Sequence, residues 1–322
     1  MKKEILGVLM KNPGKYISGA ELSESLKVSR TAVWKQIKVL KELGYEIESK
    51  PNSGYRLISS PDILQQDELT LKLRTEWLGH NMQIFEELSS TNDFAKTIAN
   101  EGAVEGPVIV AEEQTKGRGR MGRLWESPAS KGLWFSIILR PLMPPQLAPQ
   151  LIFVAAVGIC RALRGQTGLD IRIKWPNDLL YEGQKLCGIL AEMSAEIEQL
   201  NYIILGIGLN VNQENEDFSP EIVETATSLS LAARKKYRRA DVLAEILFHL
   251  EEVYTEYQEQ GFQKILKAWE SLNCTAGRQV KVMTREETFE GFAESIDEDG
   301  SLLVRRKDGQ LETVIVGDIS LR

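Results

Sequence analysis

The densest group of side chains that could bind a ligand lies at residues 116–123, in the stretch KGRGRMGRLW. Lys116, Arg118, Arg120 and Arg123 are spaced there by three glycines, in a 322-residue chain whose formal net charge is −7. Glycine lets the backbone approach a ligand closely, and arginine carries a planar, permanent charge that fits carboxylate and phosphate. We therefore predict a loop that closes over a small anion. Its like charges and its high backbone entropy should keep it mobile until the anion arrives.

This basic loop differs from two better-known anion binders. It lacks the G-x-x-x-x-G-K-[ST] spacing and precedes a strand pattern instead of a helix, so the fold is not a P-loop fold. Arg-Gly-rich tails that tether nucleic acid are the other alternative. That interpretation fits poorly, because this loop lies between two apolar strand patterns and not in a tail.

A second polar group follows a predicted strand at KWPNDLLYEGQK, residues 174–185. Pro176 interrupts strand pairing and directs Asn177 and Asp178 off the sheet. Lys185 is a point charge that can sit on a phosphate. Asn-Asp after proline is also typical of a plain turn, so both interpretations stay open.

A third polar group lies at GIGLNVN, residues 206–212. Gly206 and Gly208 within a strand pattern allow a ligand to approach the backbone closely. Asn210 and Asn212 offer amide groups that both donate and accept hydrogen bonds.

Histidine and cysteine chemistry is poorly represented. His80 and His249 are isolated, which argues against a Ser-His-Asp triad or a histidine-ligated zinc. Three well-separated cysteines indicate neither a disulfide framework nor a metal site, and reduced thiols point to the cytoplasm. Because the histidines and cysteines are isolated, we expect no metal site of the protein's own. No apolar run reaches the ~20 residues that span a bilayer, so we expect no membrane partner.

The N-terminal 60 residues differ from the rest in charge, with 11 Lys/Arg against 6 Asp/Glu, whereas the remainder has 28 against 40. The pattern predicts three helices and a hairpin, with Ser18 and Ser29 as N-caps. An apolar stripe of Val33, Ile37 and Leu40 marks the third helix. This order is that of a winged helix-turn-helix, with the motif itself at residues 18–37.

In that geometry the helix after Ser29 enters the DNA major groove with its N-terminal residues first. We predict DNA contacts from Ser29, Arg30, Thr31, Trp34 and Lys35, and the exposed face also carries Lys38. Lys50 and Arg56 flank the wing and could reach phosphates. The alternative is a protein-interaction module with a solvated basic face.

The rest of the chain reads as an α+β region and then a small barrel. Strand patterns that come in hairpins predict a mixed or antiparallel sheet with helices on one side. Short strands and turns from about Cys274 predict the barrel. We expect three domains: a DNA-binding domain at 1–62, an α+β domain at 63–272 that carries the polar groups described above, and a barrel at 273–322.

Five motifs in one order resemble the biotin protein ligase family, in its bifunctional class that also acts as the biotin-operon repressor. They are SSTND (89–93), EEQTKGRGRMGRLW (112–125), KWPNDLL (174–180), KLCGIL (185–190) and GIGLNVN (206–212). The resemblance covers essentially the whole chain. It implies a catalytic domain like that of the class II synthetases and an SH3-like C-terminal barrel.

The resemblance also implies a reaction and a set of site residues. Biotin and ATP, with Mg²⁺, would give biotinyl-5′-AMP, and the biotinyl group would pass to a lysine of the biotin carboxyl carrier protein of acetyl-CoA carboxylase. Lys185 and Arg118 are the implied catalytic residues. The implied biotin contacts are Ser90, Thr91, Asn92, Gln114, Arg118, Gly119, Arg120 and Lys185. The implied ATP or adenylate contacts are Arg123, Asn177 and Asn210.

Regulation is implied in the same way. The adenylate would favour a homodimer that binds operator DNA and represses genes of biotin synthesis or transport. Residues 213–229 correspond to a second cover over the adenylate, in which Phe218 is the one aromatic residue. Two rivals stay open: a lipoate-type protein ligase, and a non-catalytic repressor that senses a small anion.

Overall fold

The computed structural model describes residues 1–284 and 286–321, and the chain forms two compact units. The first unit holds Met1–Lys72 together with Arg238–Asp241. The second holds Leu73–Tyr237 and Val242–Arg322. The chain therefore passes between the units three times along its length.

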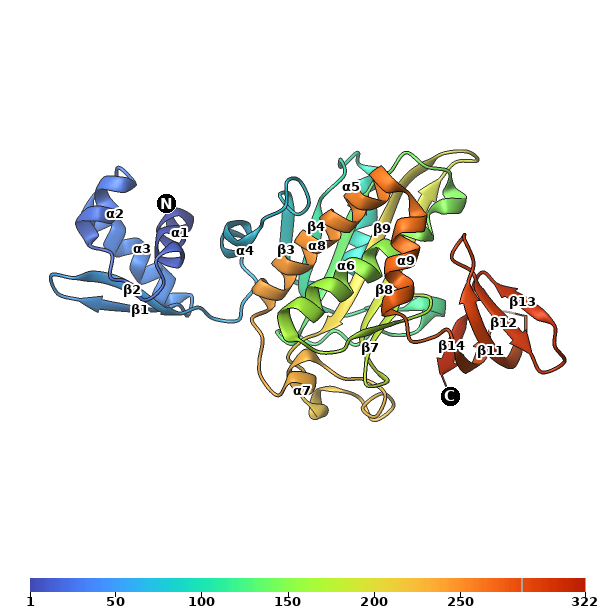
Figure 1. Cartoon of the computed structure of the whole chain (residues 1–322). Helices are drawn as coiled ribbons and strands as arrows, with labels where there is room; N and C mark the ends of the chain where they lie inside the picture. The colour runs from blue at the N-terminus through green and yellow to red at the C-terminus, as the bar shows by residue number, and fades with distance from the viewer. Residues whose placement is uncertain (285, 322) are drawn as a thin grey trace. The chain divides into compact units, whose positions relative to one another are not determined.

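The first unit is the predicted winged helix-turn-helix (Figure 1). Its elements are α1 (Lys2–Lys11), α2 (Gly19–Ser25), α3 (Arg30–Glu42), the hairpin of β1 (Glu46–Lys50) and β2 (Gly54–Ser59), and α4 (Gln66–Lys72). Ser18 Oγ accepts from Glu21 N at 3.0 Å and Ser29 Oγ accepts from Ala32 N at 3.1 Å, which confirms both N-caps. The predicted stripe of α3 is buried in the core of this unit.

A buried ionic cluster joins α4 to the start of α8 (Arg239–Gln260) inside the first unit. Glu68 is fully buried, accepts a hydrogen bond from Tyr45 Oη at 2.7 Å and pairs with Arg238. Arg239 is also fully buried, and its backbone N donates to Asp62 Oδ1 at 2.8 Å. Charged groups are rarely buried completely unless they are paired in this way.

The second unit is built on a mixed sheet in the order β3-β4-β5-β9-β8-β7-β6. Only the β3–β4 pair is parallel, which confirms the predicted mixed sheet. The strands are β3 (Met82–Leu88), β4 (Val108–Gln114), β5 (Gly132–Leu139), β6 (Arg172–Lys174), β7 (Asp178–Tyr181), β8 (Gln184–Ala195) and β9 (Leu200–Asn210).

Helices cover both faces of this sheet, so the expectation that they lie on one side was wrong. Tyr202 and Ile204 of β9 pack against Ala95 and Ala99 of α5 (Thr91–Asn100). The intervening residues of β9 point to the opposite face and are also buried. That face is the side of α6 (Gln150–Thr167), α8 and α9 (Phe262–Leu272), which Figure 1 shows in front of the strands.

The segment Pro145–Thr167, which contains α6, is long and apolar enough to cross a membrane by length and composition alone. This corrects the statement that no apolar run is long enough. Its mean hydropathy is 1.5, and 72% of the apolar window is buried inside the structure. The segment therefore has the surroundings of a core helix.

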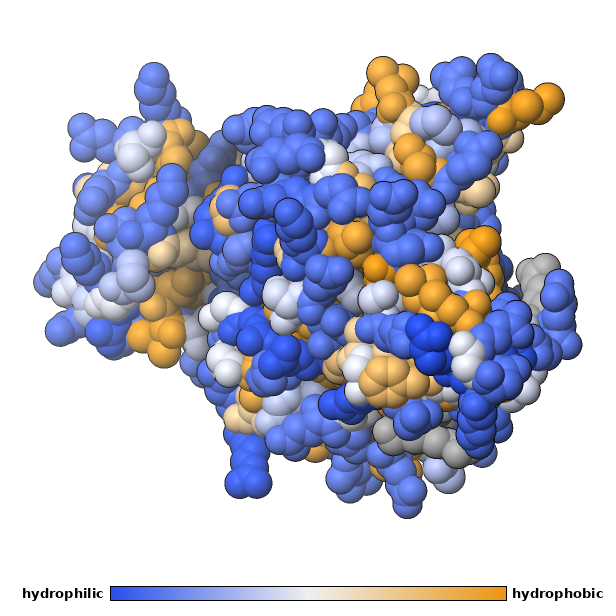
Figure 2. Space-filling view, turned by 45° about the vertical axis from the view of Figure 1, so that its right-hand side comes forward, coloured by the Kyte–Doolittle hydropathy of each residue, from blue (hydrophilic) through white to orange (hydrophobic). Residues whose placement is uncertain are grey.

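The C-terminal strands form a five-stranded antiparallel sheet in the order β13-β12-β11-β10-β14. They are β10 (Arg278–Met283), β11 (Thr288–Ile296), β12 (Leu302–Arg306), β13 (Leu311–Val314) and β14 (Asp318–Leu321). Turns at 297–300 and 307–309 separate β11 from β12 and β12 from β13. The surface in Figure 2 is mostly hydrophilic, with apolar side chains in small separate groups, as on most folded proteins.

Candidate active site

One cavity of about 280 Å³ opens on the face of the sheet that α5 also covers. Every residue implied to contact biotin, ATP or adenylate lines it. These residues are Ser90, Thr91, Asn92, Gln114, Arg118, Gly119, Arg120, Arg123, Asn177, Lys185 and Asn210. The structure thus brings together motifs that lie more than 100 residues apart in the sequence.

The floor of the cavity is a network of hydroxyl and amide groups at the start of α5. Ser136 Oγ lies 2.7 Å from Thr91 Oγ1 and donates to Asn92 Oδ1 at 2.6 Å. Gln114 Oε1 accepts from Thr91 N at 2.8 Å, and Asn92 Nδ2 donates to Glu192 Oε2 at 2.6 Å. Because each group is held by another, the floor presents a fixed pattern of donors and acceptors to a neutral polar ligand.

The glycines of β9 make room for side chains. A Cβ on Gly206 would lie 2.2 Å from Asn92 Oδ1, and one on Gly208 would lie 2.4 Å from Trp125 Nε1. Gly188 of β8 faces the same indole, with 2.9 Å to Trp125 Cζ3. Gly206 and Gly208 also line the cavity, and each leaves room beside the strand for a side chain, that of Asn92 and that of Trp125.

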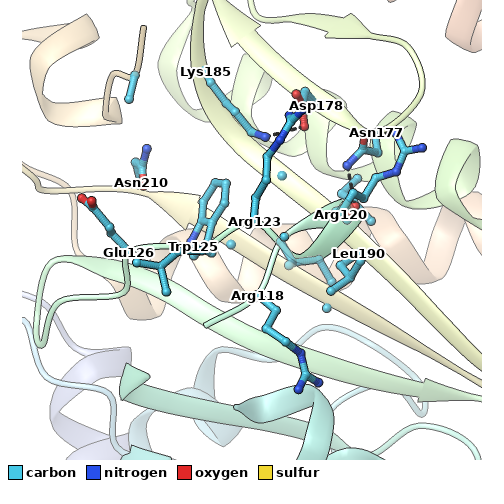
Figure 3. Close-up of a pocket in the computed structure, with 18 of the residues that line it drawn as sticks. Arg118, Arg120, Arg123, Trp125, Glu126, Asn177, Asp178, Lys185, Leu190 and Asn210 are labelled. Carbon is cyan, nitrogen blue, oxygen red and sulfur yellow. Dashed lines mark hydrogen bonds and ion pairs between the residues drawn. The ribbon is translucent and has the colours of Figure 1, made fainter. Parts of the chain in front are cut away.

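The basic loop is folded and hydrogen-bonded. Gly119 N donates to Arg123 O at 2.8 Å, and Trp125 N donates to Gly117 O at 3.0 Å. Arg118 forms two hydrogen bonds with Asp93, Nη1 to Oδ2 at 3.0 Å and Nη2 to Oδ1 at 2.5 Å. The hydrogen bond with Asp93 raises the pKa of Arg118. Figure 3 shows this guanidinium directed away from Lys185 and Asp178.

Arg120 and Arg123 lie towards the C-terminal sheet. Arg120 Nη1 donates to Asn177 Oδ1 at 3.0 Å, and its Nη2 donates to Gly317 O at 3.1 Å. Asp318 lies between both arginines, 3.2 Å from Arg120 Nη1 and 2.8 Å from Arg123 Nη2. Burial lowers the pKa of Arg120, against the opposing effect of Asp318. Carboxylates distant in sequence therefore offset the repulsion from which we predicted mobility.

Lys185 faces the same part of the cavity. Its Nζ lies 2.8 Å from Asp178 Oδ1 and 5.2 Å from the centre of the Trp125 ring (Figure 3). Asn177 Nδ2 donates to Ile189 O at 2.8 Å, and Asp178 begins β7. The Trp175–Pro176 peptide bond is cis. Residues 175–177 form the turn between β6 and β7, and Asn177 and Asp178 also line the cavity, so the two interpretations are compatible.

Residues 213–229 form the opposite wall. Gln213 Nε2 donates to Asn210 Oδ1 at 2.9 Å, and Phe218 is buried and lines the cavity. Lys185 N donates to Thr225 O at 2.7 Å, so the far part of this segment pairs with the start of β8. Asn212 was considered as a ligand contact, but its amide bonds both backbone groups of Tyr237, at 2.7 and 3.0 Å.

Several cavity residues were missed from the sequence. Trp125 lies inside the basic motif, and an aromatic residue beside such a loop is the signal that could have identified it. Asp318 lines the cavity, whereas Asp93 and Glu192 lie outside the lining and hold the loop and the floor; Asp93 belongs to the SSTND motif, and no local pattern marks Glu192 or Asp318.

Metal-binding groups are sparse in the part of the chain that the structure describes. No group of three or more His, Cys, Asp and Glu side chains there is arranged to hold a metal ion. The carboxylates that line the cavity are those of Glu126, Asp178, Asp217 and Asp318. Of these, Asp178, Asp217 and Asp318 each pair with Lys or Arg.

The predicted DNA-contacting residues share one surface of the first unit. Ser29, Arg30, Thr31, Trp34 and Lys35 are all exposed on or beside α3. In the wing, Arg56 Nε donates to Glu48 Oε2 at 3.2 Å, and its guanidinium lies 4.7 Å from the Tyr16 ring centre. Its charge is thus partly compensated within the protein, which the sequence did not indicate.

Comparisons with known proteins agree with this arrangement. Family models match an HTH domain at residues 2–56, the Biotin/lipoate A/B protein ligase family at 84–210 and the Biotin protein ligase C terminal domain at 275–322. The Bifunctional ligase/repressor BirA of Bacillus subtilis (strain 168) is 41% identical, covering 100% of this chain and 98% of that protein. BirA of Escherichia coli (strain K12) is 29% identical, covering 96% and 94%.

A solved structure extends the likeness to the ligase part. The biotin protein ligase from Aquifex aeolicus in complex with biotin and ATP is 30% identical, with a TM-score of 0.64. The match covers 76% of this chain and 99% of that one. Fold and cavity thus define a protein ligase joined to a helix-turn-helix DNA-binding domain. The chain belongs to the biotin protein ligase family, in its bifunctional ligase/repressor class.

Proposed function

We propose that the cavity activates biotin with ATP to biotinyl-5′-AMP and passes the biotinyl group to a lysine of the biotin carboxyl carrier protein of acetyl-CoA carboxylase. The observation that carries this is the meeting of a neutral polar floor with Arg118, Arg120, Arg123 and Lys185 in one cavity. The floor suits the uncharged ring system of biotin. The cations suit its carboxylate and the phosphates of ATP.

The reaction needs no histidine or cysteine nucleophile. The biotin carboxylate oxygen attacks the α-phosphorus, and the bond to pyrophosphate breaks. The lysine amine then attacks the biotinyl carbonyl carbon and loses a proton, the bond from this carbon to the bridging oxygen breaks, and AMP leaves with that oxygen. The first step gains from bringing two anions together and from neutralising charge on the phosphorus centre. We assign that neutralisation to Lys185 and to the loop arginines, with Arg118 at the edge of the cavity.

Magnesium would arrive with ATP. Mg²⁺ in nucleotide sites is held by one or two carboxylates together with phosphate oxygens, which matches a cavity that has carboxylates but no dedicated metal cluster among its described residues. Glu126 and Asp178 are the residues that would hold it, and it would neutralise phosphate charge. Trp125, which lies over Lys185 between two glycines, is our candidate surface for the purine base.

The test is mass spectrometry of a carrier domain incubated with the protein, ATP and biotin, with lipoate as a parallel arm. We expect one biotinyl group added to the carrier and none with lipoate. Transfer of lipoyl alone would favour the lipoate-type ligase. Absence of biotin-dependent ATP–pyrophosphate exchange would favour the non-catalytic sensor.

We further propose that biotinyl-5′-AMP is the corepressor. Adenylate binding would favour a homodimer in the cytoplasm that places two winged helices on one palindromic operator of biotin genes. For this role we retain the proposed domains 1–62, 63–272 and 273–322. Sedimentation with and without adenylate tests the coupling, and identical monomer populations would rule it out.

A further inference from the structure

We propose that Lys131 and Glu126 are positioning residues that fasten Asn212 and the first part of the second cover, residues 213–219, to the chain that continues the basic loop. The basic loop and residues 213–229 then close over the cavity as one unit. The inference rests on the proposed function only where it names the adenylate as the retained ligand.

Lys131 holds this segment at two points. Its Nζ lies 2.7 Å from Asp217 Oδ2, and its carbonyl oxygen accepts from Asn212 N at 2.7 Å. Five residues earlier, Glu126 Oε2 accepts from Ser219 N at 3.2 Å. Two side chains and one carbonyl of residues 126–131 thus hold one stretch of eight residues.

The fastening points follow the basic loop without a gap. The loop closes through the hydrogen bonds from Gly119 N to Arg123 O and from Trp125 N to Gly117 O, at 2.8 and 3.0 Å. Glu126 is the next residue after Trp125. Any opening of the loop that moves Trp125 therefore acts directly on the residue that holds Ser219.

The held segment is organised to receive this fastening. Asp217 ends a short 3₁₀ turn, Asn215–Asp217, and also accepts from Glu214 N at 2.8 Å. Burial would raise the pKa of Asp217, but the hydrogen bonds from Lys131 and Glu214 leave it below its usual value. Phe218, which lines the cavity, follows directly. Holding Asp217 in place therefore also restricts the position of Phe218 in the cavity wall.

The two ends of the second cover are held differently. At the far end the backbone of Lys185 bonds Thr225 O at 2.7 Å and Thr227 N at 3.0 Å, as an extension of β8. At the near end one backbone bond, from Asn212 N to Lys131 O, is joined by the side-chain contacts of Lys131 with Asp217 and of Glu126 with Ser219 N. Side-chain substitution can thus loosen residues 213–219 and leave the sheet and the backbone bond of Asn212 intact.

The first experiment is amide hydrogen exchange on the full-length protein without ligand. Lys131→Met keeps the apolar stem and removes the charge. We expect exchange across residues 212–222 to become about two- to fivefold faster, the range for an ion pair that is partly exposed. Lys307→Met is the matched control, because Lys307 Nζ pairs with Glu290 at 3.0 Å outside the cavity lining. It should leave this exchange unchanged, and unchanged exchange in Lys131→Met would overturn the proposal.

The second experiment follows the release of labelled adenylate from Lys131→Met, Asp217→Asn and the double variant. Asp217→Asn can still accept from Glu214 N, so it removes the ion pair selectively. We expect release about two- to fivefold faster in each, with the double variant no faster than either single variant. Effects that multiply in the double variant would show separate roles and refute the fastening. A wild-type protein that forms no adenylate refutes the proposed function, and the exchange experiment then still decides the fastening.

Discussion

Replacing Gly206 by alanine should damage the cavity floor from the sheet beneath it. The new Cβ would lie 2.2 Å from Asn92 Oδ1 and 2.8 Å from Asn92 Cγ, so the amide has to move. This movement breaks the 2.6 Å bond from Ser136 Oγ and the 2.6 Å bond to Glu192 Oε2. Ser136 keeps its contact with Thr91 Oγ1 and Glu192 keeps its ion pair with Lys96, so the loss is that of the two bonds made by Asn92.

The size of the effect follows from the two bonds. A neutral hydrogen bond contributes about 0.5–1.5 kcal/mol, and one to a charged group about 1.5–3 kcal/mol. Losing the two hydrogen bonds should reduce transition-state stabilisation by about 2–4 kcal/mol. This loss corresponds to a fall of about 30- to 1,000-fold in kcat/KM. Because the floor faces the biotin ring in our proposal, the change should fall mainly on KM for biotin.

The assay is biotin-dependent ATP–pyrophosphate exchange at varied biotin, with thermal unfolding measured in parallel. The control is Gly165→Ala in α6, where no atom lies within 4 Å of the new Cβ. It should raise stability by about 0.5–1 kcal/mol and leave activity unchanged. A folded Gly206→Ala protein with kcat/KM within about threefold of wild type would refute this reasoning.

Four further predictions concern the loop, the DNA surface and the thiols. Arg118→Ala should still form adenylate but release it faster than wild type, because a short neutral side chain cannot hold the anion; wild-type retention in a trapping assay contradicts the loop assignment. Asp318→Asn leaves Arg120 and Arg123 without their shared carboxylate. Trypsin should then cleave within residues 116–123 about tenfold faster, since a charge-assisted bond contributes roughly 1.5–3 kcal/mol. Lys35→Ala should weaken operator binding and reduce the salt slope by about one; an unchanged slope would remove Lys35 from the phosphate contacts. Burial raises the pKa of Cys160 to about 12, so less of it is thiolate at any given pH. Iodoacetamide at about pH 8 should therefore modify it far more slowly than a free thiol, and rapid modification in the folded protein would contradict its burial.

Local patterns were sufficient for the elements that fold on nearby residues. The N-caps at Ser18 and Ser29 and the stripe of α3 depend on spacings of three or four residues, and all are confirmed. The mixed sheet was also predictable, because hairpin spacing and buried strand patterns are local. The gathering of the ligand motifs into one cavity came from the family resemblance, and the structure shows that gathering.

What could not be predicted depends on partners distant in the chain. The loop arginines looked like a repelling cluster because Asp93 and Asp318 are not near them in sequence. Glycine is needed at position 206 because Asn92 of α5 packs against that face of the strand. The position of α5 on the second face was missed because its apolar residues fit a helix on either face. Tertiary partners of this kind have no local signature.

The ionic cluster of the first unit determines whether the helix-turn-helix domain can be removed without affecting the rest of the chain. A chain that begins at residue 73 keeps Arg238 and Arg239 but loses Glu68 and Asp62, the acids that fix the first turn of α8. A fragment that ends at residue 72 keeps Glu68 against Tyr45 without its guanidinium. Removing the N-terminal DNA-binding domain therefore removes the acidic partners that hold the beginning of α8, a long helix of the ligase part. A truncation that abolishes DNA binding should therefore also change the ligase part that remains.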